Sequence, residues 1–408
     1  MERWFFLMIP YKVILSILSI LLVILVLELG GNAFWVGLVG TFSTLGTMLG
    51  SLYFGKKAFQ TFFKFKFFFY TFLGFTIFLF LLYLVKNLIL TLLLTFLIWF
   101  IQSSFFFGAY ALISEKKYKA KETMGKLEKI GGFAWVGGIF VGFCLSSFFT
   151  LQTILFTLFL ISLISFLLLP FFLSERIIDE ITKEFLKEIG ILEEFLTKFK
   201  IFLRIPHLHT LISHPYNFKF VEIVSSKHLK FHFGFFLVFI AIGLVFSQYV
   251  NFMKTSGLNT NLIFLITLIS SILSAIFYEI AAHSKNEYDT FRKNLLLRTF
   301  IFLLLSLCAF NIIPLVPTLI TFEIMIGITW AYLYINSYYL ILKLAKHEIG
   351  FKSFFENLGY ILGSFLSGII VLNFGFHFNF LTASILIFLT FIYFSLLKYR
   401  SKLHVEKV

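Results

Sequence analysis

The chain alternates between long apolar runs and short polar breaks. Most of the runs supply the ~20 residues that a helix needs to cross ~30 Å of hydrocarbon. We therefore predict an all-α polytopic membrane protein with twelve transmembrane helices. The twelve runs occupy residues 11–33, 34–55, 65–85, 88–112, 125–148, 151–173, 231–251, 258–283, 296–313, 317–342, 353–372 and 378–398.

The basic residues are distributed very unevenly between the two sides of these spans. Of the 34 Lys and Arg residues, 32 belong to the segments on the side of the N-terminus, and only Lys86 and Lys254 belong to the other side. Cytoplasmic loops retain Lys and Arg because the translocation of these residues is disfavoured. We therefore expect a multi-pass protein of the cell membrane with both termini in the cytoplasm.

The composition supports the membrane assignment. A mean hydropathy of +0.97, with 60% apolar and 13% charged residues, excludes an ordinary soluble domain. The net charge of +14 follows from the basic loops, which can attract anionic lipid head groups of the bilayer. We expect no nucleic acid partner, because no basic module stands clear of the spans. Cys144 and Cys308 fall inside spans, where they act as small apolar residues.

One long polar segment divides the chain into two sets of six spans. The predicted units are residues 1–173, a cytoplasmic linker at 174–230 and residues 231–408. Apolar residues recur every three or four positions over 175–200, which predicts an amphipathic helix on the membrane surface. The linker also contains a histidine group that is either a surface cluster or a metal site: His207, His209 and His214. We expect no cofactor.

The two sets of spans resemble each other. Residues 45–54 and 269–278 align small residues with small residues and aromatic residues with aromatic residues. Glu128-x-x-Gly131 recurs as Glu356-x-x-Gly359 at nearly the same offset. These two matches predict a parallel six-helix repeat.

Twelve spans, cytoplasmic termini, a long central loop and a half repeat together resemble the major facilitator superfamily. The resemblance covers essentially the whole chain in architecture, whereas its motifs are weak. Residues 50–57 keep the glycines and basic residues that the family places between spans 2 and 3, but the acidic residue is absent. The family's arginine in span 4 is also absent, so the subfamily cannot be assigned. The resemblance implies alternating access, with spans 1, 4, 7 and 10 lining a central cavity.

Two carboxylates inside spans are candidates for function, because a charged, unpaired carboxylate within a membrane costs several kcal/mol. They are Glu28 in span 1 and Glu323 in span 10. Glu323 shares one helical face, within roughly 60°, with a glycine, two aromatic residues and a serine. The members of that face are Gly327, Trp330, Tyr334 and Ser337, and Gln102 of span 4 is a further candidate.

The expected spans place no Lys or Arg at mid-depth. A midplane site for a phosphate or a dicarboxylate usually needs such a residue. This pattern disfavours anionic solutes and favours neutral, aromatic or cationic ones, which Trp330, Tyr334 and Gln102 could bind.

We therefore predict a monomeric, proton-coupled secondary transporter of a small solute, and not an enzyme. Glu323 would bind the proton, and Glu28 would be its partner or a contact for the solute. Two alternatives stay open at this point. One is a polytopic membrane enzyme acting on lipid or lipid-linked substrates, and the other is a non-transporting membrane scaffold or receptor.

Overall fold

A computed structural model of the chain describes residues 3–61, 64–114, 120–172, 229–284, 286–344 and 349–405. Within these ranges the regular structure is entirely helical. A short 3₁₀ helix, η1 (Arg3–Leu7), precedes α1 (Met8–Glu28), α2 (Ala33–Gln60), α3 (Lys66–Leu84), α4 (Leu88–Ser114), α5 (Ala120–Phe148), α6 (Leu151–Phe172), α9 (Leu229–Thr255), α10 (Thr260–Ala282), α11 (Glu287–Ala309), α12 (Leu315–Leu344) and α13 (Ile349–Val405).

Helix α13 is two antiparallel limbs joined at Gly375. This glycine has φ of 85° and ψ of 172°, a backbone conformation that other residues rarely adopt. Before it, Ser364 packs against Gly243 of α9. After it, the amide of Asn379 donates a hydrogen bond of 2.6 Å to the carbonyl of Leu244, so the chain has turned back along α9. The two limbs match the predicted spans 353–372 and 378–398.

Ten of the described helices are long and apolar enough to cross a membrane. Helix α11 falls short on composition because it carries five charged residues, yet it packs against α12 and α13 as the other spans do. Counting α11 and both limbs of α13, the described ranges contain one helix for each of the twelve predicted spans. The predicted helix at 175–200 lies outside the described residues.

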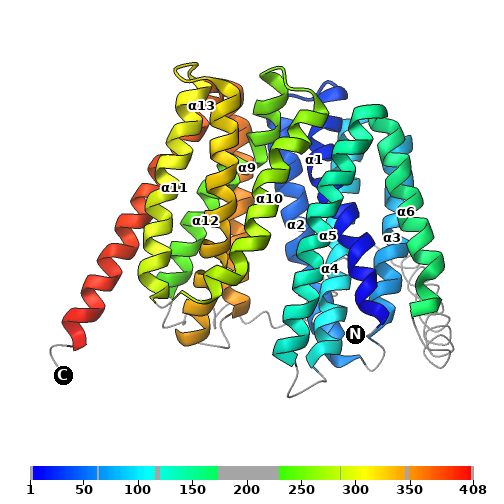
Figure 1. Ribbon diagram of the computed structural model, residues 1–408, viewed down its shortest axis with the longest axis horizontal. Coiled ribbons are helices and arrows are strands. Elements are labelled where there is room, and N and C mark those ends of the chain that lie inside the picture. The colour runs from blue at the N-terminus through cyan, green and yellow to red at the C-terminus, as the bar shows by residue number, and fades with distance from the viewer. Residues whose placement is uncertain are drawn as a thin grey trace, which may run out of the picture.

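The helices form two groups that follow the chain order. In the first, α1 packs with α5, α2 with α4, and α3 with α4 and α6. In the second, α9 packs with α13, α10 with α12, and α11 with α12 and α13. Figure 1 shows the first group in blue to green beside the second group in green to red, with both chain ends at the lower side. We call that lower side the basic side and the opposite one the far side.

Glycines bring helices of each group into backbone contact. Gly46 and Gly50 of α2 lie against the carbonyl oxygens of Phe96 and Phe100 of α4, so close that a Cβ atom could not fit. Gly359 and Gly363 of α13 lie in the same way against α9. In lipid, where helices gain little from the hydrophobic effect, such close approach is a main source of association.

On the far side the two groups are also in contact with each other. A Cβ atom on Gly37 of α2 would lie 2.6 Å from the Ser364 carbonyl and 2.9 Å from Gly368 Cα. The Gln248 amide of α9 donates a hydrogen bond of 2.8 Å to the Ala33 carbonyl. We call this set of residues, Ala33, Gly37, Gly40, Gln248, Ser364 and Gly368, the far-side closure.

On the basic side the groups separate. The hydrogen bond between Gln248 and Ala33 and the ring contact between Phe34 and Phe365, which join the two groups, both lie in the far half of the helices. Tyr334, past the middle of α12, is 44% exposed, yet Glu128 of the opposite group is near enough to interact with it electrostatically. Because the Tyr334 side chain is accessible and also lies near the first group, it lines a space between the two groups. We therefore infer that the space between the groups opens toward the basic side.

Candidate functional site

Glu323 is a buried carboxylate held between three helices. It is the ninth residue of α12 and is 3% exposed. Its carboxyl group faces the hydroxyl groups of Tyr249 on α9 and Ser270 on α10, although the Tyr249 hydroxyl stays just outside hydrogen-bond geometry. Gly327, one turn further along, makes this arrangement possible: a Cβ atom there would lie 2.6 Å from the Ser270 carbonyl, so only glycine lets α10 approach α12.

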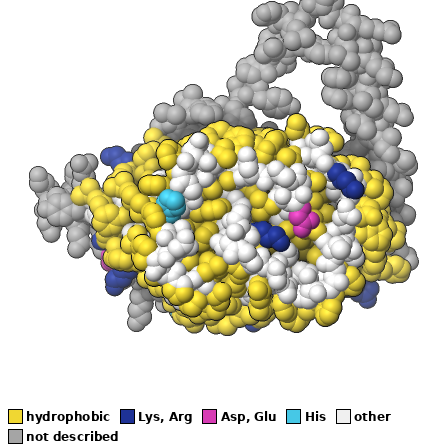
Figure 2. All heavy atoms as spheres, turned by 90° about the horizontal axis from the view of Figure 1, so that it is seen from above, with side chains coloured by type: hydrophobic (Ala, Val, Ile, Leu, Met, Phe, Trp, Pro, Cys, Tyr) yellow, Lys and Arg dark blue, Asp and Glu magenta, His cyan; other side chains and the backbone are white. Residues whose placement is uncertain are grey.

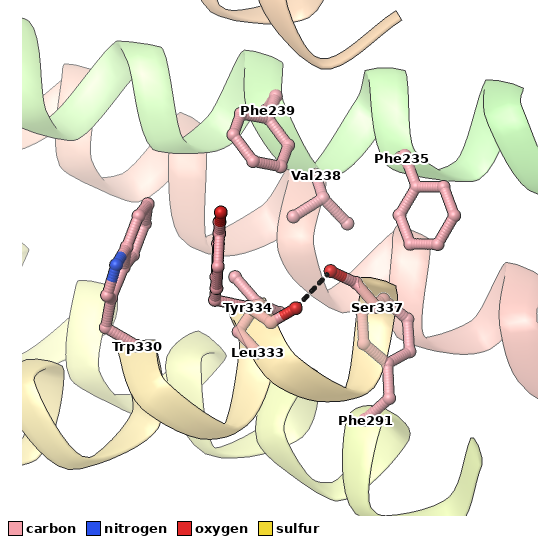
Figure 3. Close-up of a pocket in the computed structure, with 8 residues that line it drawn as sticks. All are labelled: Phe235, Val238, Phe239, Phe291, Trp330, Leu333, Tyr334 and Ser337. Atoms are coloured by element: carbon pink, nitrogen blue, oxygen red, sulfur yellow. Dashed lines mark hydrogen bonds between the residues drawn. The ribbon is translucent and has the colours of Figure 1, made fainter. Parts of the chain in front are cut away.

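Trp330 and Tyr334 lie further along the same face of α12 and line a small apolar pocket (Figure 3). The Ser337 hydroxyl donates to the Tyr334 carbonyl at 3.0 Å and is therefore occupied by its own helix. The pocket offers mainly ring faces and aliphatic groups to a ligand. Its walls are Phe235, Val238 and Phe239 from α9, Phe291 from α11, and Trp330, Leu333, Tyr334 and Ser337 from α12.

Gln102, which the sequence suggested as a contact for the solute, lies among three helices of the first group. It is 8% exposed, accepts a hydrogen bond of 2.6 Å from the Tyr11 hydroxyl and donates one of 3.3 Å to Thr47. The Tyr11 ring stacks on Phe105 at 4.1 Å. Gln102 therefore joins α1, α2 and α4 inside the first group, and in the described residues no contact links it to Glu323.

The structure does not bring the two predicted carboxylates together. Glu28 is the last residue of α1 and is exposed on the far side, whereas Glu323 is buried between α9, α10 and α12. Figure 2 shows the far face, where charged side chains are sparse among hydrophobic and neutral ones. A role for Glu28 beside Glu323 stays a prediction that this geometry does not favour.

The expectation of no basic residue at mid-depth is wrong. Arg298 is the twelfth of the 23 residues of α11 and is 0% exposed. Its guanidinium lies 5.4 Å from the centre of the Trp330 ring, and none of its three nitrogens has a hydrogen-bond partner. The predicted span, 296–313, began too late and placed Arg298 at its edge.

A sequence signal could have corrected that boundary. The helix begins at Glu287, and its first turn also contains Asp289. Acidic residues at this position stabilise the positive end of the helix dipole and mark a helix start. Average hydropathy missed this start because the first two turns of α11 are polar.

The repeat places two tyrosine–glutamate pairs on the basic side. The Tyr110 hydroxyl of α4 donates a hydrogen bond of 2.8 Å to Glu128 of α5. Tyr338 of α12 lies within electrostatic reach of Glu356 of α13, and both members are shifted by 228 positions from the first pair (338 − 110 and 356 − 128). Glu128 also interacts electrostatically with Tyr338, so the two pairs face each other.

Each pair has a lysine nearby. Lys352 forms an ion pair with Glu356, and its own side chain is 2% exposed. Lys12 of α1 lies within electrostatic reach of Glu128 and 5.8 Å from the centre of the Trp135 ring. Glu356 is thus held by an ion pair within its own helix.

Metal binding gains no support from the described ranges, which contain no group of three or more His, Cys, Asp or Glu side chains that could hold an ion. The candidate cluster His207, His209 and His214 lies outside these ranges, so its role stays a prediction.

The sequence matches no known family model and no curated protein. Solved structures are similar over nearly the whole chain. The nucleoside transporter NupG has 12% identity and a TM-score of 0.71, covering 96% of this chain and 97% of its own. The human organic anion transporter MFSD10 (TETRAN) has 14% identity and a TM-score of 0.62, covering 96% and 98%.

A mutant of the peptide transporter POT has 11% identity and a TM-score of 0.69, covering 98% of this chain and 95% of its own. At such identities the likeness establishes the fold. The chain therefore has the twelve-helix fold of the major facilitator transporters, as its resemblance to that family predicted.

Proposed function

We propose that the chain is a secondary active transporter that moves a small solute by alternating access. One observation carries the proposal: two six-helix groups are packed together on the far side and separated on the basic side, so the central space is open to one side only. Solved proteins of the same fold include transporters of nucleosides, organic anions and peptides. If the basic side closed and the far side opened, a solute bound between the groups would be released on the other side of the membrane.

The orientation in the membrane follows from charge. Lys86 and Lys254 lie on the far side, and the other described Lys and Arg residues lie within or near the basic half. Because basic residues stay in the cytoplasm, the basic side faces the cytoplasm and the structure is open inward. A cysteine replacing Asn259, between α9 and α10, should be labelled by an impermeant maleimide from outside the cell. Labelling from inside alone would reverse the orientation.

The pocket at Trp330 and Tyr334 supports a solute with an aromatic or apolar group. Ring faces bind planar groups by stacking, and few fixed polar atoms compete for them. The sequence favoured neutral, aromatic or cationic solutes. The pocket supports the aromatic part of that prediction. The exclusion of anions loses its basis, because it relied on the absence of a mid-depth cation and Arg298 is such a cation.

We propose Glu323 as the proton-binding residue. A charged carboxylate at this depth costs several kcal/mol unless it is paired. The ion pairs among the described residues join Arg292 with Asp289 and Lys352 with Glu356, and none includes Glu323. A proton would remove the charge, and the hydroxyl groups of Tyr249 and Ser270 could then exchange hydrogen bonds with the neutral acid. If Glu323 released that proton to the open side in each transport cycle, proton movement would be coupled to movement of the solute.

The test uses proteoliposomes loaded with a pH-sensitive dye and challenged with nucleosides, aromatic amino acids, aromatic acids and aromatic amines. We expect at least one class to drive proton movement in the native protein. Glu323→Gln should abolish this movement while counterflow exchange of the same solute persists, because the amide imitates a permanently neutral acid.

Glu28→Gln is the matched control, since its carboxylate is exposed, and it should leave proton movement within about twofold of the native rate, the scale of one exposed charge. Native proton movement in Glu323→Gln would remove Glu323 from the mechanism. The absence of any solute-driven flux and of any counterflow would count against transport itself.

A further inference from the structure

Arg298 is a buried cation that the proposed proton site does not use. All three guanidinium nitrogens are buried without a hydrogen-bond partner. Five N–H donors in this position carry a heavy desolvation cost unless an anion or acceptor binds them. The cation–π contact with Trp330, at 5.4 Å, offsets part of the cost and leaves the donors unused.

Two carboxylates of the second group have other cationic partners. Asp289 is paired with Arg292, and Glu356 is paired with Lys352. Glu323 lies seven residues, about two helical turns, before Trp330, and faces Tyr249 and Ser270. In the described part of the second group, no ion pair includes Arg298.

The guanidinium lies beside the apolar pocket. Trp330 stands at one end of the pocket in Figure 3, with Ser337 toward the other. Phe291, another wall residue, precedes Arg298 by seven residues on α11, so both occupy nearly the same face of that helix. The indole of Trp330 therefore separates an apolar pocket from an unsatisfied cation.

We propose that this region binds an amphipathic organic monoanion, with its carboxylate on Arg298 and its aromatic or aliphatic body in the pocket. The inference deepens the proposed transport function by naming the class of solute. A guanidinium presents a planar fork that matches a carboxylate through two parallel hydrogen bonds. Trp330 covers the guanidinium in the present conformation, so its indole turns aside when the anion binds.

The experiment compares acids with their own amides on the purified full chain in detergent. The probes are phenylacetate, indole-3-acetate and hexanoate, each beside its amide, at constant ionic strength and pH 7. Affinities come from the ligand dependence of the thermal unfolding midpoint. For at least one pair we expect the acid to bind roughly 10- to 100-fold more tightly than the amide, the range for a charge-assisted pair.

Arg298→Met should remove this preference, and Arg298→Lys should retain part of it. Arg292→Met is the matched control, because Arg292 lies on the same helix and already has an acidic partner, and it should keep the native preference. If Arg298→Met does not fold, Trp330→Ala tests the anion site instead. This variant uncovers the guanidinium of Arg298 and should therefore keep or increase the preference for the acid.

No acid preference in the native protein, an unchanged preference in Arg298→Met, or its loss in Trp330→Ala would overturn the proposal. The assay needs no proton gradient, so it is separable from the test of coupling. Glu323→Gln should retain the preference for the acid. The two proposals can fail separately. If the acid is still preferred, but Glu323→Gln does not change proton movement, the anion site is supported and the proton site is rejected.

Discussion

The far side and the basic side of the molecule are built from different chemistry. The far-side closure uses glycines, a serine and backbone atoms in direct contact, with a single hydrogen bond between the groups. The basic side presents aromatic hydroxyl groups and carboxylates, such as Tyr110 and Glu128 opposite Tyr338. A closure of small residues depends on steric fit, because one added side chain prevents contact. A polar closure tolerates water and depends on hydrogen bonds and charge.

The largest effect should come from filling the far-side closure. In a chain with Cys144→Ser, Cys308→Ser and the reporter Ser247→Cys, Gly368→Leu should hold the far side open. A side chain there meets the backbone of α2, with Ala33 and Phe34 atoms at 3.0–3.1 Å from a Cβ atom. We expect labelling of the reporter by an impermeant maleimide from the far side to rise at least tenfold and transport to be lost, since the closed form is excluded.

Gly132→Leu is the matched control, because nothing lies within 4 Å of a Cβ atom at Gly132. It should label as slowly as the parent chain. Equal labelling in Gly368→Leu and the parent would show that far-side contact does not set access.

A smaller effect should follow from removing the hydrogen bond across the same closure. Gln248→Ala loses the bond to the Ala33 carbonyl, and such a bond contributes about 0.5–1.5 kcal/mol. Labelling of the Ser247→Cys reporter should therefore rise about 2- to 10-fold. Gln152→Ala, at an exposed glutamine on the far side, should leave the rate unchanged. A rise as large as that of Gly368→Leu would mean that the hydrogen bond, rather than steric fit, holds this side shut.

The smallest effect should come from the basic side. Tyr110→Phe removes the hydrogen bond to Glu128 and should slow transport about two- to fivefold, within the range for one exposed hydrogen bond. Far-side labelling should not change. Tyr338→Phe, at the equivalent position, should have a similar effect, whereas Tyr83→Phe, whose ring packs on Phe156, should have none. A change in far-side labelling by Tyr110→Phe would show that the two closures are coupled.

The helices were predictable because most of the apolar runs are long and free of charge, and the face of α12 was predictable because helical spacing places Glu323, Trp330 and Tyr334 on one side. The positions of Glu28 and Arg298 were not, since average hydropathy blurs helix ends by several residues. α1 ends at Glu28, and α11 begins nine residues before the predicted start at 296.

The contacts between helices could not be predicted from the sequence either. Tyr110 pairs with Glu128, and Gln102 pairs with Tyr11, only because α4 packs beside α5 and α1. Spacing along one helix contains no information on such partners. The repeat is an exception, because it placed Glu128 and Glu356 in equivalent positions before either partner was known.

The polar character of α11 has a consequence for how the chain enters the membrane. An arginine at the centre of a span raises the insertion cost by about 2.5–3.5 kcal/mol, so we expect α11 to insert poorly alone. A short turn at residues 310–314 joins it to α12, which carries Trp330. We therefore expect the two helices to enter the bilayer as one hairpin, with the indole covering the guanidinium from the moment of insertion.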